Sequence, residues 1–226
     1  MNFTVFATNA AGAGPSSSPS GTIATTTCFP GDSSVYSRDN GIIRMDTLQI
    51  GTEVWVQQDN GQFGWEPILA FMHYDPDTIE SYYRLRYRVP GYDRRFGAIT
   101  ASARHLLLSD GNHMKPTGEF QVGDALNLAD GSRTVVEEVQ PTVQSRGAYS
   151  PLTYSGTIVV DGIVASCYAP PKGVSHRHAH WAMAPARWFY WWRALAPRPS
   201  KGILPYCEFL TQVAISVQPF VSFGLN

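Results

Sequence analysis

The sequence predicts an all-β protein, and three observations lead to this assignment. Short apolar runs with strand-like alternation recur through the middle of the 226-residue chain, for example "EVWVQQDNGQFGWEPILAF" and "YYRLRYRV". Asn-Gly and Asp-Gly pairs at 60–61 and 130–131 are strong signals for tight hairpin turns. A nine-residue pattern occurs twice, as "LQIGTEVWV" (48–56) and "FQVGDALNL" (120–128). These features favour a β module made of two related halves with pseudo-twofold symmetry.

The first 27 residues are expected to lie outside this module. Phe3, Val5 and Ala7 alternate as on one face of a strand, and a Gly-, Pro- and Ser-rich stretch follows. The run resembles the last strands of a fibronectin type III domain. Because a lone strand cannot bury its own face, residues 1–27 are interpreted as the end of such a domain, cut from a longer protein, and a flexible linker.

Residues 28–169 form the predicted β module, with further strands expected in "ALNLADGSRTVVEEV" and "GTIVVDGIVASCYA". Residues 170–226 differ, because they are rich in proline and aromatic residues and end in an apolar tail. This C-terminal region is expected to be partly helical. Either it packs on the module as a pair of helices, or its aromatic side chains meet a ligand, a membrane or a partner. The candidate ligand-binding side chains are Trp181, Trp188, Trp191 and Trp192.

The composition excludes several classes of function. A net charge of −1 at pH 7 gives no Lys/Arg excess for phosphate binding, so no nucleic-acid partner is expected. No stretch of about 18 apolar residues predicts a spanning helix, and the N-terminus lacks the pattern of a signal peptide. The 3 cysteines are an odd number at wide spacing, which disfavours a zinc ribbon or a dense disulfide framework. A monomer with at least one free thiol is expected.

Cys28 directly follows the Thr-rich end of the linker, a position that suits an intramolecular acyl shift. Its thiol could attack the carbonyl of Thr27 through a five-membered ring, replacing the amide by a thioester. Because nucleophile and scissile bond are adjacent, the effective concentration is already high. Ser102 and His105 in "TASARHLLL" offer a hydroxyl and an acid/base for the proton transfers. Alternatively, His105 is a hydrogen-bonded structural residue beside three leucines.

Three motifs together resemble one family. "CFPG" from Cys28, "SARH" from Ser102 to His105 and "GTIVVDGIVASCYA" (156–169) are similar to the Hint module of Hedgehog proteins, the autoprocessing domain shared with inteins. The similarity covers residues 28–169 and extends more loosely into "AHWAMAPARW" and "GILPYCEFL". It implies a horseshoe-like all-β Hint fold with duplicated halves, followed by a sterol-recognition region.

The resemblance also implies a reaction. The family cuts the bond before its first cysteine by an N-to-S acyl shift, and the hydroxyl of cholesterol then resolves the thioester to leave a C-terminal sterol ester. Carried onto this chain, Cys28 is the nucleophile, Thr27 keeps the sterol and His105 assists the shift. Ser102 stands where the family usually has threonine. A sterol is the expected co-substrate and no other cofactor is required.

The same resemblance implies a location. The protein is expected in the secretory pathway, in the endoplasmic reticulum, with its product secreted or at the cell surface. The C-terminal region is expected to associate with the membrane.

Cys167 occupies the position of the family's second cysteine. A disulfide between Cys28 and Cys167 would block the first step, because the thiolate is the attacking species, so any such pairing is expected to be reversible. Alternatively, Cys167 is a small buried hydrophobe in a strand.

One position departs from the family pattern. Hedgehog modules carry an aspartate after an apolar pair as general base on the sterol hydroxyl, whereas this chain has His73 after Phe71 and Met72. Imidazole, with an ordinary pKa of about 6.5, can also accept that proton near neutral pH. Four interpretations stay open: His73 is the base for sterol transfer, the acceptor is another alcohol or water, Asp75 replaces the family aspartate, or His73 is a solvent-facing turn residue.

No metal is expected in the mechanism. Cys28, His73 and His105 are ligand types that zinc prefers, but their separation matches no recognised metal spacing, so zinc bound there is interpreted as inhibitory or accidental. "HRHAH" (176–180) is interpreted as a linker or as the polar edge of the tail.

Other functions fit the sequence less well. Protein splicing is not expected, since no His-Asn pair followed by Cys, Ser or Thr closes the module. A cysteine protease acting in trans is disfavoured, because Cys28 sits beside its own flexible leader. A non-catalytic β-rich binding module remains the alternative to an enzyme.

Overall fold

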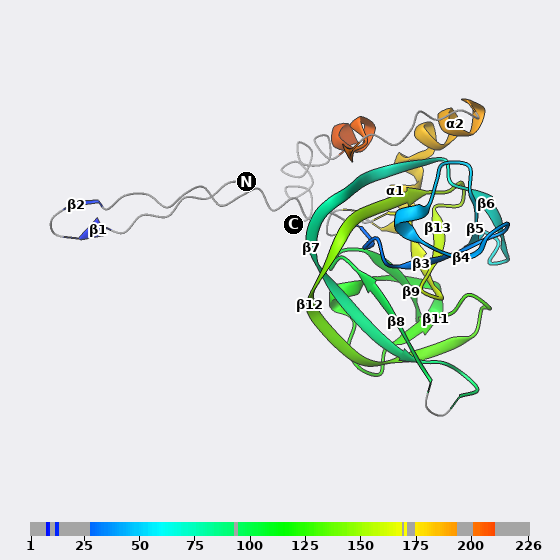
Figure 1. Cartoon of the computed structure of the whole chain (residues 1–226), viewed down its shortest axis with the longest axis horizontal. Helices are drawn as coiled ribbons and strands as arrows, with labels where there is room; N and C mark the ends of the chain where they lie inside the picture. Colours follow the sequence, from blue (N-terminus) through cyan, green and yellow to red (C-terminus); the bar gives the residue numbers. More distant parts are fainter. Residues whose placement is uncertain are drawn as a thin grey trace, which may run out of the picture.

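The chain folds mainly into β-strands, which confirms the predicted all-β class (Figure 1). The computed structural model describes residues 8–9, 12–13, 28–92, 95–168, 170, 175–193 and 201–210, with the side chains of 8–9, 12–13, 112 and 191–193 excluded. Strands within these ranges form an eight-stranded sheet, a five-stranded sheet and a small hairpin. None of the helices in the described part has the length and hydropathy that a bilayer-spanning segment requires.

The eight-stranded sheet runs in the order β10-β9-β14-β13-β3-β5-β6, with β4 paired to β3. Three of its strands, β9, β13 and β14, are buried at every position, because their sequences are continuous apolar runs rather than alternating ones. They form the middle of the sheet. The strands are β3 (Ser34–Ser37), β4 (Gly41–Arg44), β5 (Glu53–Gln57), β6 (Phe63–Pro67), β9 (Leu106–Ser109), β10 (His113–Pro116), β13 (Thr157–Val160) and β14 (Ile163–Ser166).

Two long strands dominate the five-stranded sheet, whose order is β11-β12-β7-β15 with β8 paired to β7. Antiparallel pairing joins β7 to β12 along most of their length, interrupted by register shifts at four places. Such bulges bend a strand, and Figure 1 shows both strands curving together around one side of the molecule. The strands are β7 (Ala70–Arg88), β8 (Phe96–Ala101), β11 (Ala125–Asn127), β12 (Arg133–Leu152) and β15 (Gly202–Ile203).

The two halves predicted from the sequence repeat each other in their backbone hydrogen bonds. Hairpin β3–β4 leads into the 3-10 turn η1 (Met45–Thr47), and hairpin β9–β10, closed by η2 (Asp110–Asn112), leads into η3 (Thr117–Glu119). Each turn is followed by a glycine with positive φ, Gly51 at 89° and Gly123 at 94°. Each glycine donates its N–H over 2.8 Å to a carbonyl further along the chain. The pseudo-twofold duplication is therefore confirmed.

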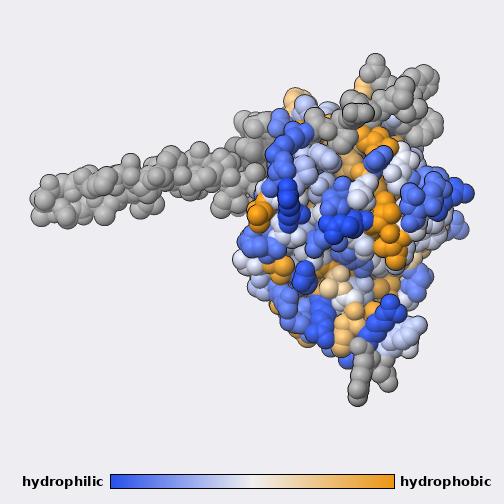
Figure 2. Space-filling model, in the orientation of Figure 1, coloured by the Kyte–Doolittle hydropathy of each residue, from blue (hydrophilic) through white to orange (hydrophobic). Residues whose placement is uncertain are grey.

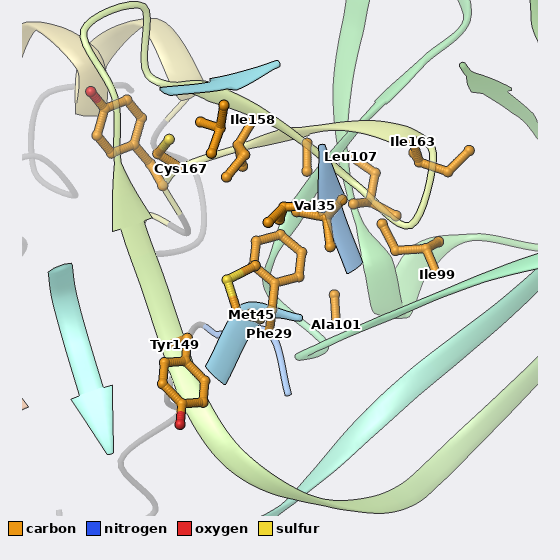
Figure 3. Close-up of a cluster of buried hydrophobic side chains, with 14 of the residues drawn as sticks. Phe29, Val35, Met45, Ile99, Ala101, Leu107, Tyr149, Ile158, Ile163 and Cys167 are labelled. Atoms are coloured by element: carbon orange, nitrogen blue, oxygen red, sulfur yellow. The ribbon is translucent and has the colours of Figure 1, made fainter. Parts of the chain in front are cut away.

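A single large cluster of buried side chains fills the interior between the sheets (Figure 3). Phe29, Val35 and Met45 come from the first half, and Leu107 and Tyr149 from the second. Phe29 is fully buried at the centre of this cluster. Because Phe29 directly follows Cys28, packing of the core fixes the position of Cys28.

The C-terminal region packs on the β module. It contains α1 (His176–Ala182), α2 (Ala184–Arg193), the short strand β15 and helical residues 205–210. Met183 and Ala186 are buried in the same cluster as the strands, and Tyr190 and Cys207 pack against it. The described residues of this region therefore agree with the interpretation of helices that pack on the module.

The leading segment contains a short hairpin where it is described. β1 (Thr8–Asn9) pairs antiparallel with β2 (Gly12–Ala13). The predicted face of Phe3, Val5 and Ala7, and the rest of the Gly-, Pro- and Ser-rich stretch up to Thr27, lie outside the described residues.

Candidate active site

The backbone around Cys28 is held on both sides. Phe29 and Tyr149 of β12 exchange two N–H to carbonyl hydrogen bonds, of 2.8 and 2.9 Å. The N–H of Ser102 donates to the carbonyl of Cys28 over 3.0 Å. Cys28 itself is completely buried. The thiol therefore has a fixed position at the point where the linker enters the module.

The thiol of Cys28 lies against His73. The distance from Cys28 Sγ to His73 Nδ1 is 2.8 Å. His73 belongs to β7 and pairs with Ser150 of β12 on one side and Ile203 of β15 on the other. The interpretation of His73 as a solvent-facing turn residue is wrong, because two neighbouring strands hold it beside the nucleophile.

Burial keeps both members of this pair neutral. Burial raises the pKa of the Cys28 thiol well above its ordinary value, and the carboxylates of Glu80 and Asp75 raise it further. Burial also lowers the pKa of His73, although the same two carboxylates act in the opposite direction. Both groups are therefore neutral at pH 7, and with the imidazole hydrogen on Nε2 the thiol donates its hydrogen to Nδ1.

Ser102 contacts the amide of Cys28. The N–H of Cys28, which belongs to the predicted scissile bond, donates to Ser102 Oγ over 3.0 Å in a buried environment. Ser102 thus bonds Cys28 through its side chain and through its own N–H. The hydroxyl, which serine shares with the threonine usual in Hedgehog modules, makes the contact.

His105 is fully buried with one ring nitrogen available. Its ring lies 4.0 Å from the ring of Phe29, measured between centroids, and its Nε2 lies 2.7 Å from the carbonyl oxygen of Ser166. Since a carbonyl only accepts, Nε2 carries the hydrogen. Nδ1 has no hydrogen-bond partner among the described residues. Burial lowers the pKa of His105 to about 4, so the ring is neutral at pH 7.

The duplication explains where His105 lies. Its N–H donates to the carbonyl of Ser102 over 2.9 Å, as the N–H of Ser33 donates to the carbonyl of Pro30 over 3.3 Å in the first half. The carbonyls of Ser33 and His105 then accept from the first residues of η1 and η3, over 2.7 and 2.8 Å. Ser102 and His105 therefore occupy the turn that matches Pro30 and Ser33, so one half carries the cysteine and the other the hydroxyl and imidazole.

Cys167 is a buried thiol near the end of β14. Its Sγ lies 3.4 Å from Thr153 Oγ1, and burial raises its pKa to about 12. Cys28 and Cys167 are both free thiols, with no disulfide between them.

Asp75 is engaged at the edge of the sheet. Its Oδ1 accepts the N–H groups of Asp77 and Thr78, over 3.1 and 3.3 Å, and forms an ion pair of 3.3 Å with Lys201. The carboxylate of Asp75 is thus bonded to backbone N–H groups and to Lys201, whereas His73 contacts the Cys28 thiol.

Two of the four candidate tryptophans of the C-terminal region are largely exposed. Trp181 and Trp188 are 68% and 66% exposed, on α1 and α2. Trp191 and Trp192 belong to α2, and their side chains lie outside the described residues. On the face of the module shown in Figure 2, hydrophilic residues predominate and hydrophobic residues gather in a narrow band.

Two of the candidate zinc ligands, Cys28 and His73, are in contact. Nevertheless, no group of three or more His, Cys, Asp or Glu side chains within the described ranges is arranged to hold a metal ion.

The histidine tract lies in a helix and not in a linker. His176 and His180 are four residues apart on α1, and both contact the end of β14. His176 Nδ1 lies 2.8 Å from Ser166 Oγ, and His180 Nδ1 lies 3.1 Å from the hydroxyl of Tyr168. The spacing of the two histidines is the signal that could have revealed a helix face.

Comparison with known proteins gives consistent results. The chain is 30% identical to Sonic hedgehog protein of Danio rerio over 177 residues, which are 73% of this chain and 40% of that protein. It is 29% identical to Indian hedgehog B protein of Danio rerio over 200 residues, 81% of this chain and 47% of that protein. The chain thus spans less than half the length of these relatives.

Solved structures show the same fold at low identity. The DnaB intein from Synechocystis sp. matches with a TM-score of 0.50 and 16% identity, covering 62% of this chain and 97% of the intein. The DnaX mini intein from Spirulina platensis matches with a TM-score of 0.50 and 15% identity, covering 62% of this chain and 98% of the intein.

A duplicated β fold with a buried cysteine after a linker, an imidazole at its thiol and a hydroxyl at its amide defines a self-processing module. The family model of the Hint module matches residues 15–219. The chain therefore belongs to the Hint family, and its hedgehog relatives support the Hedgehog type within it.

Proposed function

We propose that the chain cleaves its own Thr27–Cys28 bond through an internal thioester. One observation carries this proposal: His73 Nδ1 lies 2.8 Å from Cys28 Sγ, which provides a base for the thiol where the linker joins the module. A thiol becomes a strong nucleophile when an adjacent base accepts its proton.

The first step balances within the site. The sulfur of Cys28 attacks the carbonyl carbon of Thr27, a C–S bond forms, and the C–N bond between the two residues breaks. The thiol proton passes to His73, and the Cys28 nitrogen gains one proton. His105 is the proposed carrier of that second proton: its unpartnered Nδ1, unprotonated at pH 7, takes up a proton and gives it to the Cys28 nitrogen, while Ser102 holds the amide through its hydroxyl. When His73 then releases the thiol proton, one proton has been taken up and one released, so none is consumed overall.

The second step resolves the thioester, and we assign a sterol hydroxyl to it. The hydroxyl oxygen attacks the thioester carbonyl and the C–S bond breaks. His73, neutral again after the first step, accepts the hydroxyl proton and passes it to the leaving Cys28 sulfur, which becomes a thiol. The resemblance to Hedgehog modules and the exposed Trp181 and Trp188 favour a sterol. Water is the second candidate, because a histidine stands where Hedgehog modules have their aspartate.

The mass of the released fragment separates the two acceptors. The full chain is incubated with cholesterol in detergent, with Cys28→Ala as the control that should stay intact. Sterol transfer predicts a 1–27 fragment heavier than the free acid by one cholesterol less one water. A 1–27 fragment released only as the free acid at every cholesterol concentration would contradict sterol transfer and identify water as the acceptor.

The setting of this reaction follows from the same proposal. The chain acts as a monomer in the secretory pathway, on a fibronectin-like upstream segment that leaves as the product. Association of the C-terminal region with the membrane would bring the module to its sterol. Binding to cholesterol-containing vesicles, compared between the full chain and a Trp181→Ala, Trp188→Ala variant, tests that association.

A further inference from the structure

Helix α1 contacts the residue that orients His105. The hydrogen on His105 Nε2 is donated to the carbonyl oxygen of Ser166 over 2.7 Å. The side-chain oxygen of the same Ser166 lies 2.8 Å from His176 Nδ1 on α1. Ser166 thus connects His176 to His105, the proposed proton donor of the first step.

The direction of the hydrogen bond between His176 and Ser166 follows from a third contact. The backbone N–H of Tyr168 donates to Ser166 Oγ over 2.8 Å. Because an N–H group only donates, the hydroxyl hydrogen of Ser166 remains free to point at His176 Nδ1. We assign His176 as the acceptor, with its hydrogen on Nε2, and Ser166 Oγ is bonded on both sides.

His176 belongs to a helix face that is anchored at a second point. His180, one turn further along α1, lies 3.1 Å from the hydroxyl of Tyr168 through its Nδ1. The rings of His176 and His180 stack, with centroids 5.9 Å apart and planes at 20°. Arg187 of α2 donates to the carbonyl of His180 over 3.0 Å. This double attachment gives the His176 contact a fixed geometry.

We propose that His176 is a positioning residue for the acyl shift, acting on His105 through Ser166. The inference rests on the proposed roles of Cys28 and His105. Without His176, the Ser166 hydroxyl and the peptide that carries its carbonyl lose a restraint, and the His105 ring loses its fixed orientation. The C-terminal region then contributes to the first step as well as to the choice of acceptor.

Cleavage induced by dithiothreitol isolates the first step, because this thiol resolves the thioester without a sterol. Single-turnover rates are measured on the full chain and on His176→Ala, Ser166→Ala and the double variant. We expect each single variant to cleave about 10-fold more slowly, below the roughly 100-fold that a 1 Å misplacement can cost. The double variant should be no slower than the slower single one, because both changes break the same connection.

Two further variants separate positioning from loss of structure. His176→Asn places an amide oxygen near the position of Nδ1 and should restore most of the rate. His178→Ala, on the same helix but with its ring nitrogen bonded to Ser175, should cleave like the parent chain. Melting temperatures identify any variant that fails to fold. If His176→Ala does not fold, the proposal is tested by the rate of His176→Asn, which should be close to the parent rate.

The proposal is overturned if His176→Ala cleaves at the parent rate, if the losses in the two single variants multiply, or if His176→Asn is as slow as a folded His176→Ala. A parent chain that does not cleave with dithiothreitol would instead contradict the proposed function.

Discussion

Cys28 and His73 form a neutral pair rather than an ion pair. Burial raises the pKa of the thiol and lowers the pKa of the imidazole, so the proton stays on sulfur until the carbonyl is attacked. A thiol in this state is a poor target for oxidation, because the thiolate is the reactive form. The neutral pair thus limits oxidation of the thiol before the acyl shift.

His73→Ala tests whether His73 serves the first step. One interpretation of the sequence places His73 at the acceptor hydroxyl, which would leave cleavage by dithiothreitol intact. Its 2.8 Å contact with Sγ predicts instead that the substitution slows that cleavage, by roughly 10²–10⁴-fold if His73 acts as a general base.

The matched control for this experiment is His113→Ala, which removes an exposed histidine on β10. Unchanged cleavage by dithiothreitol in His73→Ala would show that His73 does not activate the thiol.

Burial of neutral His105 predicts a dependence of stability on pH. Its pKa is about 4 in the folded chain and about 6.5 when unfolded, so between these values the unfolded state binds more protons. The free energy of unfolding should therefore fall as the pH drops from 6.5 towards 4, by about 3 kcal/mol from this residue.

Urea unfolding across this pH range, compared between the parent chain and His105→Gln, isolates the contribution of His105. If the free energy of unfolding changed with pH in the same way in both proteins, the lowered pKa of His105 would be refuted.

The site could be predicted from the sequence only in part. Cys28, Ser102 and His105 lie in short motifs, which a resemblance can place. The register of β7 brings His73 to Cys28, 45 residues away in the sequence. The docking of α1 brings His176 to Ser166, 10 residues away. No local pattern encodes such contacts.

At the scale of elements, the duplicated turns should be equivalent in energy as well as in geometry. Gly51 and Gly123 have positive φ, and a Cβ at either position would meet nothing within 4 Å. Replacement by alanine therefore costs only backbone strain, about 1–2 kcal/mol at each site.

Urea unfolding of Gly51→Ala and Gly123→Ala measures these costs. Gly64→Ala is the control, because Gly64 has no positive φ and its nearest neighbour is the flexible Gln58 side chain. A loss at only one of the two positions would indicate that the halves have diverged in their turns.

The short elements follow local signals, whereas the long strands do not. The Asn-Gly and Asp-Gly pairs at 60–61 and 130–131 predict tight turns between strands correctly, and the repeated nine-residue pattern predicts the duplication correctly. β7, however, runs through Asp75, Pro76 and Asp77, a sequence typical of a turn. The carboxylate of Asp75 satisfies the N–H groups of the next residues, and pairing with β12 continues beyond this point. Tertiary pairing here overrides local preference.

At the scale of the whole molecule, the C-terminal region completes the core. Met183, in the junction between α1 and α2, is 4% exposed and belongs to the same cluster as the strands. Met183→Ala should lower the free energy of unfolding by about 2–5 kcal/mol.

Trp181→Ala is the matched control for Met183→Ala. Trp181 is 68% exposed, so its removal should change stability by no more than about 0.5 kcal/mol. Equal effects of the two changes in urea unfolding would contradict a shared core.

Self-cleavage at one bond is the central claim, and the site of cleavage tests it most directly. The full chain is treated with dithiothreitol, and the two products are identified by mass and by N-terminal sequencing. The account predicts a large product that begins at Cys28 and a small product, residues 1–27, that carries the dithiol on its C-terminal carbonyl. Cleavage at another bond, or the same products from Cys28→Ala, would contradict the account.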